Sequence, residues 1–431
     1  CWARPTTSSS SDRSPVASRV RRQIERDPAV GDGLARWGLL FLSGTLLAGY
    51  VKETPLFAWV PGDLTALCAG LTGLFAVARA LVGARISQRP LLMVLGLYAV
   101  FCIGVFQSTG SDYASAKLLR LFTITAVCAV APALLIRTRA HVLWFVQTTL
   151  AFASVVVVLT VFAPAPEDPA VATRAVAEGS SILAGGRSGG FVIVSAVALA
   201  VLSRLRWVVA IPLMAASTYV VLTSGSRGPL LAAGITVVLM LLIKPAARAR
   251  SGRGRLVVAI GVLAVAGYIM FTQLLSDFIQ QRFGLLFAAD QGDSIDARRY
   301  ILDIASTETA SHPFGVGWGG LEPSLAPSAQ YPHNVVAEVF AEAGWIAGAA
   351  FLVYIAAALV RARRDVLVLP LLTYWLLNAL VSGDVNDNRA LFAFLGVAIA
   401  LGGVAVTRAD REGAQGSVRD LERASAAPSH A

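Results

Sequence analysis

Residues 334–360 read NVVAEVFAEAGWIAGAAFLVYIAAALV, and this stretch decides the fold class. It is longer than the roughly 20 residues that an apolar helix needs to cross a bilayer. It therefore predicts a transmembrane helix. The residues before it, Tyr331, Pro332 and His333, close a long polar segment. His333 thus stands where a loop meets a membrane span.

The rest of the chain has the same character. Of its 431 residues 56% are hydrophobic and only 14% are charged, and the mean hydropathy is +0.67. A soluble protein needs far more charge at its surface. We predict an all-α polytopic membrane protein, because a helix satisfies its own backbone hydrogen bonds within a bilayer. Apolar runs predict about twelve transmembrane helices, at 34–51, 56–78, 91–107, 118–136, 141–163, 189–203, 207–222, 229–243, 256–275, 334–360, 366–382 and 389–407.

Basic residues indicate the orientation of these spans. They cluster at every second connection: Arg79, Arg85 and Arg89; Arg137 and Arg139; Arg204 and Arg206; Lys244 to Arg255; and Arg361, Arg363 and Arg364. Basic loops are retained in the cytoplasm. We therefore expect both termini inside and a large extracytoplasmic loop, 276–332, between the ninth and tenth spans. Basic loops beside anionic lipid headgroups also account for the net charge of +10 without nucleic acid.

Three regions follow from this composition. Residues 1–33 are rich in Ser and Arg, lack an apolar core and predict a disordered basic cytoplasmic arm. Residues 34–408 form the predicted transmembrane catalytic domain, and 409–431 a disordered cytoplasmic tail. The cysteines, Cys1, Cys68, Cys102 and Cys128, form no paired motif, so we expect packing residues instead of disulfides. Cys1 at the start suggests a trimmed chain or an acylated cysteine, and the charge of the arm argues against the second.

Arginines on the predicted outer side are the first candidates for a site. Arg187 and Arg227 lie in GGRSGG and TSGSRGP, and Arg282 lies in QRFG. Glycines let a backbone approach a ligand closely, and a guanidinium matches phosphate oxygens at any relevant pH. Together these arginines could bind a diphosphate at the outer leaflet. The alternative for each alone is an interfacial anchor or a helix-end contact.

His333 is the candidate general base. An unperturbed imidazole pKa near 6.5 lets it accept a proton from a hydroxyl at neutral pH. Asn334 beside it and Glu338 one turn later could orient the ring or a sugar hydroxyl. The alternative is a structural helix start, with Asn334 as the cap. If the loop lies outside the cytoplasm, the substrate must bring its own energy, which excludes ATP-driven mechanisms.

Other motifs predict structure. The GVGWGG segment at 315–320 predicts a tight turn, to which His312 also belongs. Asp290, Asp293 and Asp296 predict a solvated helix start, because a calcium loop needs a flanking Gly and a distal Glu that are missing. Asp384, Asp387 and Arg389 predict a solvated loop or an ion pair. No spacing such as HExxH or CxxC points to a metal.

Together these residues resemble the O-antigen ligase and polymerase superfamily, membrane glycosyltransferases of the GT-C type. The resemblance rests on Ser226-Arg227-Gly228 opening a span, on Arg298-Arg299 followed by the HPFGVG segment at 312–317, and on His333-Asn334 followed by Glu338, Glu342 and Gly344. It implies transfer of a glycan from undecaprenyl diphosphate to an acceptor sugar hydroxyl, without metal or cofactor. The expected partners are the lipid-linked donor, a glycan or glycolipid acceptor, membrane lipids and polysaccharide assembly proteins.

The resemblance also assigns roles. It implies that His333 activates the acceptor, that Arg187, Arg227 and Arg282 bind the lipid diphosphate, and that Asn334, Glu338, Arg298 and Arg299 support the site. It places the protein in the bacterial cytoplasmic membrane with the site on the extracytoplasmic side. Ligase and polymerase both remain open. A transporter of bicarbonate or another small anion is the rival function, although ionisable residues near the middle of the membrane are few. A scaffolding subunit is the third.

Overall fold

The computed structural model describes residues 28–52, 57, 59–60, 62–82, 88–162, 182–224, 226–242, 261, 293–325 and 331–401. The predicted tail, most of the predicted arm, Arg282 and almost all of the predicted span at 256–275 lie outside these residues. Within the described ranges every regular element is a helix, which confirms the predicted all-α class.

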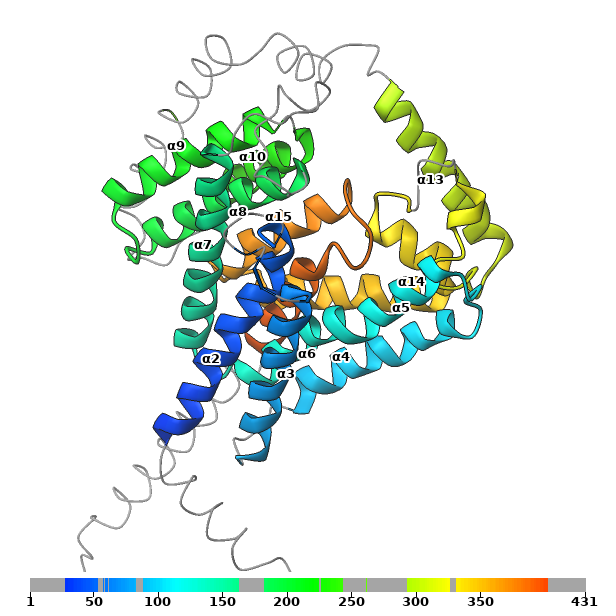
Figure 1. Ribbon diagram of the computed structural model, residues 1–431, viewed down its shortest axis with the longest axis horizontal. Coiled ribbons are helices and arrows are strands. Elements are labelled where there is room, and N and C mark those ends of the chain that lie inside the picture. The colour runs from blue at the N-terminus through cyan, green and yellow to red at the C-terminus, as the bar shows by residue number, and fades with distance from the viewer. Residues whose placement is uncertain are drawn as a thin grey trace, which may run out of the picture.

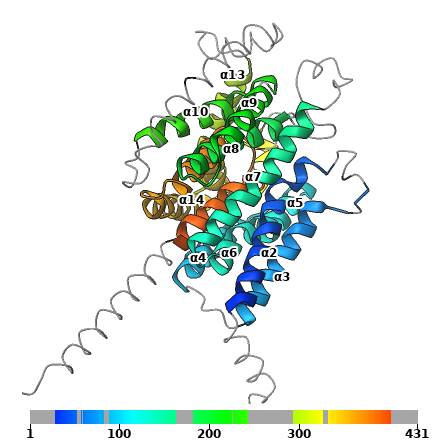
Figure 2. The same cartoon turned by 90° about the vertical axis from the view of Figure 1, so that its left-hand side faces the viewer.

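The first half of the chain forms a set of helices that pack against one another. They are α2 (Pro28–Leu47), α3 (Leu64–Leu81), α4 (Gln88–Phe101), α5 (Asp112–Arg120), α6 (Ala126–Leu135) and α7 (Arg139–Val161). A π-helical turn, Leu121–Thr125, joins α5 to α6 without a break. Helix α2 packs between α3 and α7 (Figure 2).

The second half of the chain contains α8 (Ile182–Val201), α9 (Trp207–Thr223), α10 (Arg227–Leu242), α13 (Asp293–Ser311), α14 (Val335–Ala362), α15 (Val368–Ala379) and a last helix, Arg389–Leu401. The helices of the second half pack against those of the first half, with α8 against α7 and α14 against α4. Helices α8, α9 and α10 pack as a group, and α13 lies along the edge of the molecule against α14 (Figure 1). Helix α13 includes Asp293 and Asp296, in agreement with the helix start predicted for the spaced aspartates, and Asp290 lies outside the described residues.

Six helices among the described residues are long and apolar enough to cross a membrane, and four shorter apolar helices accompany them. The chain is therefore a multi-pass membrane protein, but the predicted number of twelve spans is not confirmed. The six are Leu64–Leu81, Gln88–Val105, Asp112–Leu135, Arg139–Val161, Ala184–Val201 and Val335–Ala362.

The start of α2 corrects one predicted boundary. We expected a disordered arm as far as residue 33, but α2 begins at Pro28. Proline suits the first turn of a helix, because its φ is already close to the helical value and its missing N–H has no partner there. The helix therefore extends beyond the apolar run from which its start was predicted.

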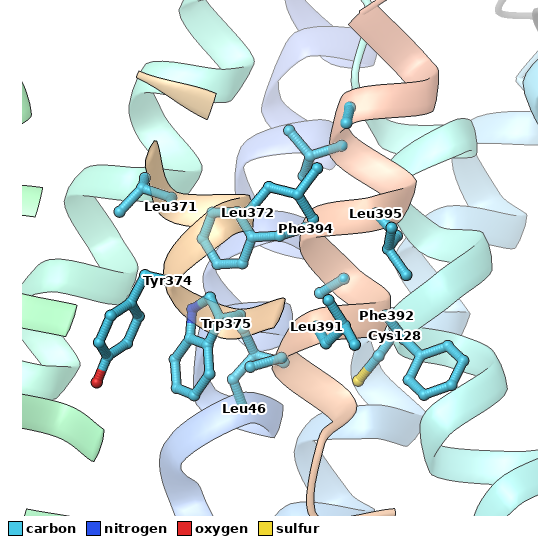
Figure 3. Packing of buried hydrophobic residues seen from close by; sticks show 14 of the residues in the cluster. Leu46, Cys128, Leu371, Leu372, Tyr374, Trp375, Leu391, Phe392, Phe394 and Leu395 are labelled. Atoms are coloured by element: carbon cyan, nitrogen blue, oxygen red, sulfur yellow. The ribbon is translucent and has the colours of Figure 1, made fainter. Parts of the chain in front are cut away.

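The core lies where α15 and the last helix meet. Figure 3 shows Leu371 and Leu372 of α15 beside Phe394 of the last helix, with Leu46 of α2 and Cys128 of α6 at the edge of the cluster. All five side chains are buried. Cys128 is thus a packing residue as predicted. Of the other described cysteines, Cys68 is partly buried and Cys102 is exposed.

The GGRSGG segment at 185–190 lies inside α8, not in a loop before a span as expected. Its glycines bring helices together. A Cβ at Gly189 would lie 2.9 Å from the carbonyl oxygen of Ser217 in α9, and one at Gly186 would meet the side chain of Ser226 before α10. Close helix approach at small residues is common in membrane bundles. The glycines therefore pack α8 against its neighbours.

Helix α14 is broken at Gly344, whose φ of 85° and ψ of −179° only glycine adopts readily. The freed carbonyl groups of Ala341 and Glu342 accept hydrogen bonds from Val316 and Gly317, both at 2.9 Å. The predicted turn at 315–320 is confirmed, and its backbone packs into the break in α14. It holds the first turns of α14, which follow His333, in place.

Several predicted cytoplasmic connections meet at one end of the bundle. Arg79 donates to the carbonyl groups of Leu134 and Leu135, and Arg139 pairs with Asp365. These contacts join the ends of α3, α6, α7 and the α14–α15 turn. The basic connections after α3, before α7 and after α14 therefore lie at the same end of the bundle. Loops on one face of a membrane have to share an end in this way.

Candidate active site

His333 occupies a strained position immediately before α14. Its φ is 55°, in the left-handed region that a non-glycine residue enters at a cost of about 1 kcal/mol. The imidazole is half-buried and its ring centroid lies 4.6 Å from that of Tyr331 in an edge-to-face arrangement. Such strain is often found at functional sites. The backbone thus presents the ring in one orientation beside Tyr331.

Charged groups surround this imidazole. Burial lowers the pKa of His333, and the positive charges of Arg298 and Arg187 lower it further, while Asp387 opposes them. These charges come from α13, α8 and the loop before the last helix, so the fold brings together residues up to 200 positions apart. With its pKa below the usual 6.5, the imidazole is neutral at pH 7 and can accept a proton.

Tyr331 belongs to the same cluster. Burial and the negative charges of Asp387 and Asp384 raise its pKa to about 12, against the effect of Arg187. Its phenol is therefore protonated at neutral pH and can donate a hydrogen bond. We predicted no role for Tyr331 from the sequence.

Arg187 is buried within α8, with 2% of its surface exposed. Its guanidinium donates to the carbonyl oxygens of Ser382 at 2.7 Å and of Asp387 at 3.3 Å. Tyr374 donates in turn to the Arg187 carbonyl at 2.6 Å. Gly383 has a φ of 75°, and a Cβ there would lie 2.6 Å from the guanidinium. Arg187 therefore holds the segment Ser382–Asn388, called here the 382–388 loop.

Arg227 and Arg298, which lies in α13, are within electrostatic range of each other. Arg227 is the first residue of α10, and its Nη1 is buried without a hydrogen-bond partner among the described residues. Burial lowers the pKa of Arg298, and the positive charge of Arg227 lowers it further. Two guanidinium groups within electrostatic range repel one another unless an anion lies between them. Arg299, also on α13, pairs instead with Asp296 at 3.7 Å.

Asn334 is the N-cap of α14. Its Oδ1 accepts from the backbone N–H groups of Val336 at 3.0 Å and Ala337 at 3.1 Å. The structural alternative for Asn334 is therefore confirmed, because this oxygen satisfies two N–H groups that the helix start leaves free.

Glu338 belongs to a buried ion cluster that we did not predict from the sequence. Its carboxylate lies 2.5 Å from the ammonium group of Lys117 in α5, and the carboxylate of Glu342 lies 2.6 Å from the same nitrogen. All three side chains are inaccessible to solvent. The sequence does contain a signal for this cluster. Two glutamates four residues apart in an apolar run lie on one helix face, and a cation must balance their charge when they are buried.

The 382–388 loop links these groups. The amide of Asn386 donates to the Lys117 carbonyl at 3.1 Å and its oxygen accepts from Thr125 at 3.0 Å. Burial and the negative charge of Asp387 raise the pKa of Asp384, whose Oδ1 accepts from the Asp387 N–H. We expected a solvated loop or an ion pair at 384–389. Asp387 is exposed as expected, but Asp384 and Asn386 are buried, and the loop connects α8, α5 and the π-helical turn.

Residues 212–352 match the family model described as O-Antigen ligase. The match supports the O-antigen ligase and polymerase family. The resemblance predicted from the sequence is thus confirmed. No curated protein matches the chain. The matched segment contains Arg227, Arg298 and His333, whereas Arg187 and the 382–388 loop lie outside it, and the charges of Arg187 and Asp387 act on His333.

Proposed function

We propose that the protein is a membrane glycosyltransferase that moves a glycan from a polyprenyl diphosphate, such as undecaprenyl diphosphate, to the hydroxyl group of an acceptor sugar. The observation that carries this proposal is the neutral, oriented imidazole of His333 beside the cations of Arg298 and Arg187. A base and positive charge side by side suit a hydroxyl nucleophile and an anionic leaving group. The O-antigen ligase match supports the same chemistry.

The proposed reaction has one displacement step. His333 accepts the proton of the acceptor hydroxyl while its oxygen bonds to the anomeric carbon and the bond from that carbon to the phosphate oxygen breaks. The lipid diphosphate leaves with the electron pair, so negative charge grows on its oxygens. Fixed guanidinium groups stabilise that charge better than water, because they need no reorganisation. The anomeric configuration inverts.

Among the arginines, Arg227 and Arg298 are the proposed diphosphate ligands. The unpartnered Nη1 of Arg227 and its electrostatic contact with Arg298 support this assignment. Arg187 adds positive charge, and its Nη1 and Nη2 are already bonded to the 382–388 loop, while its Nε has no hydrogen-bond partner among the described residues. Arg282 is retained as a ligand from the family resemblance. The site faces the extracytoplasmic side of the cytoplasmic membrane in this proposal, as the basic connections indicate.

The transporter alternative gains no support from the family match or the fold. Ligation and polymerisation use the same step and differ only in the acceptor, so the proposal covers both. The expected partners are the lipid-linked donor and a glycan or glycolipid acceptor, both reached from the membrane.

The test is glycan transfer by the purified full chain in lipid nanodiscs, with a polyprenyl-diphosphate-linked glycan as donor. We expect His333→Ala and His333→Gly to lower the rate at least about 100-fold, the usual contribution of a general base. Glycine relieves the positive φ, so the second variant remains folded. His312→Ala is the matched control, since His312 is exposed and pairs with Glu308 at 3.0 Å. A wild-type rate in either His333 variant would contradict the proposal.

A further inference from the structure

A small polar pocket lies beside the proposed active site. It encloses about 90 Å³ where the start of α3, the π-helical turn and the 382–388 loop meet. The pocket holds several water-sized groups, which is room for the hydroxyl edge of a sugar ring.

Four charged side chains line this pocket: Asp63, Arg120, Asp387 and Arg389. Two are anionic and two are cationic, so their formal charges cancel. Among the residues that the structure describes, none of the four forms an ion pair with another. The carboxylates and guanidinium groups thus leave acceptors and donors available around one cavity. Such a lining suits a neutral ligand that both donates and accepts hydrogen bonds.

The floor of the pocket is rigid and its own hydrogen bonds are satisfied. Asn386 and Thr125 are buried, bond to each other at 3.0 Å, and Asn386 also binds the Lys117 carbonyl. Thr125 lies in the π-helical turn Leu121–Thr125, and Arg120 precedes it. A π-helical turn within an α-helix is uncommon and often marks a functional site, because it redirects side chains.

Two of the charged residues are fixed by the backbone around them. One carboxylate oxygen of Asp63 caps α3 by accepting from Thr65 N–H at 2.8 Å. Arg389 Nε donates to the Leu46 carbonyl at 3.4 Å, and a Cβ at Gly49 would lie 3.0 Å from its Nη2. The pocket is therefore formed in advance of any ligand.

We infer that this pocket binds a neutral sugar residue of the acceptor or of the donor glycan through its hydroxyl groups. This inference rests on the proposed function for its connection to catalysis. Asp387 supplies that connection, because its carboxylate lines the pocket, its charge acts on His333, and its carbonyl accepts from Arg187. A diphosphate is disfavoured there, because each guanidinium is balanced by a carboxylate.

The experiment measures sugar binding and needs no transfer. Saturation-transfer NMR is recorded on the full chain in nanodiscs with methyl α-D-glucopyranoside, methyl α-D-galactopyranoside and methyl α-D-mannopyranoside, and with empty nanodiscs as background. Inorganic diphosphate is the anionic comparison. The variants are Asp387→Asn and Arg120→Gln, both at exposed side chains. Asp303→Asn on α13 and Arg364→Gln after α14 are matched controls, also at exposed positions.

We expect at least one glycoside to bind, and each pocket variant to weaken that binding at least tenfold while the controls and diphosphate binding stay unchanged. The inference is overturned if none of the three glycosides binds the parent protein, if the pocket variants bind as the parent does, or if they lose diphosphate binding instead. Circular dichroism and melting of the variants show whether they are folded. If a variant is unfolded, the other one decides.

Failure of this inference differs from failure of the proposed function. Transfer without glycoside binding rejects the pocket and leaves the function standing, whereas glycoside binding without transfer does the opposite. In the transfer assay, a higher KM for the acceptor in Asp387→Asn assigns the pocket to the acceptor sugar. A higher KM for the donor assigns it to the donor glycan.

Discussion

The guanidinium of Arg187 donates a 2.7 Å hydrogen bond to the carbonyl oxygen of Ser382, which joins α8 to the loop before the last helix. The two residues lie 195 positions apart. Through this bond a residue expected to bind phosphate also shapes the loop that carries Asp384, Asn386 and Asp387. If Arg187 holds the 382–388 loop, its substitution should lower stability. If Arg187 binds the donor, its substitution should weaken donor binding instead.

We expect Arg187→Lys to lower the free energy of unfolding by about 1–3 kcal/mol, because an ammonium group cannot reach two carbonyl groups in different directions and buried charged hydrogen bonds are worth that much. The melting temperature in nanodiscs measures it, with Arg364→Lys at an exposed position as control. An unchanged melting temperature together with a higher KM for the donor would show that Arg187 binds the diphosphate instead.

The rate of transfer should depend on pH through His333. Its pKa lies below 6.5 in the folded protein, so the imidazole is neutral and active at pH 7 and the rate falls only as pH drops below 6.5. Stability follows the same direction, because below 6.5 the unfolded chain binds the proton first. We expect Arg298→Gln to move the acid limb to higher pH, since it removes a charge that opposes protonation.

Arg299→Gln is the matched control for this shift. Arg299 is adjacent in the chain but pairs with Asp296. The pH–rate profiles of the parent and the two variants decide the matter. An acid limb that moves equally in both variants, or in neither, would contradict the role given to Arg298.

Lys117 should be required for folding. Lys117→Met leaves Glu338 and Glu342 without their cation inside the bundle, which costs about 3–5 kcal/mol for a buried ion pair that loses one partner. The triple variant Lys117→Met, Glu338→Gln, Glu342→Gln removes all three charges and should recover most of the folded yield. Size-exclusion profiles and melting temperatures compare them. Equal yields of the single and triple variants would exclude charge as the cause.

The break in α14 depends on Gly344. We expect Gly344→Ala to destabilise the protein by about 1–3 kcal/mol or more, because its φ of 85° excludes other residues and a Cβ would clash with the backbone of Phe314. Gly234→Ala in α10 is the control. Nothing lies within 4 Å of a Cβ there, and alanine in a helix should be neutral or stabilising by about 0.5–1 kcal/mol. Similar melting temperatures of the two variants would contradict the close packing of the 315–320 turn against the break in α14.

The diphosphate contact has its own test. We expect Arg227→Lys to raise the KM for the donor about tenfold or more, because a lysine cannot bind phosphate oxygens in two directions. The buried Nη1 of Arg227 without a partner is the structural reason. Arg206→Lys, at the start of α9, is an exposed control. An unchanged donor KM in Arg227→Lys would remove this residue from the proposed site.

The sequence by itself determined the helical membrane class, a helix start among the spaced aspartates, the turn at 315–320 and the resemblance to the O-antigen ligase family. These follow from local composition and spacing, since an apolar run of sufficient length can only be a helix in a bilayer. Only the tertiary structure decided what the polar residues contact. Arg187 looked like a loop residue because glycines flank it, yet those glycines pack α8 against α9 and α10. Lys117 meets Glu338 and Glu342, and Arg120 meets Asp387 at one pocket, across more than 200 positions. Partners so far apart in the chain are chosen by helix packing, which no local pattern encodes.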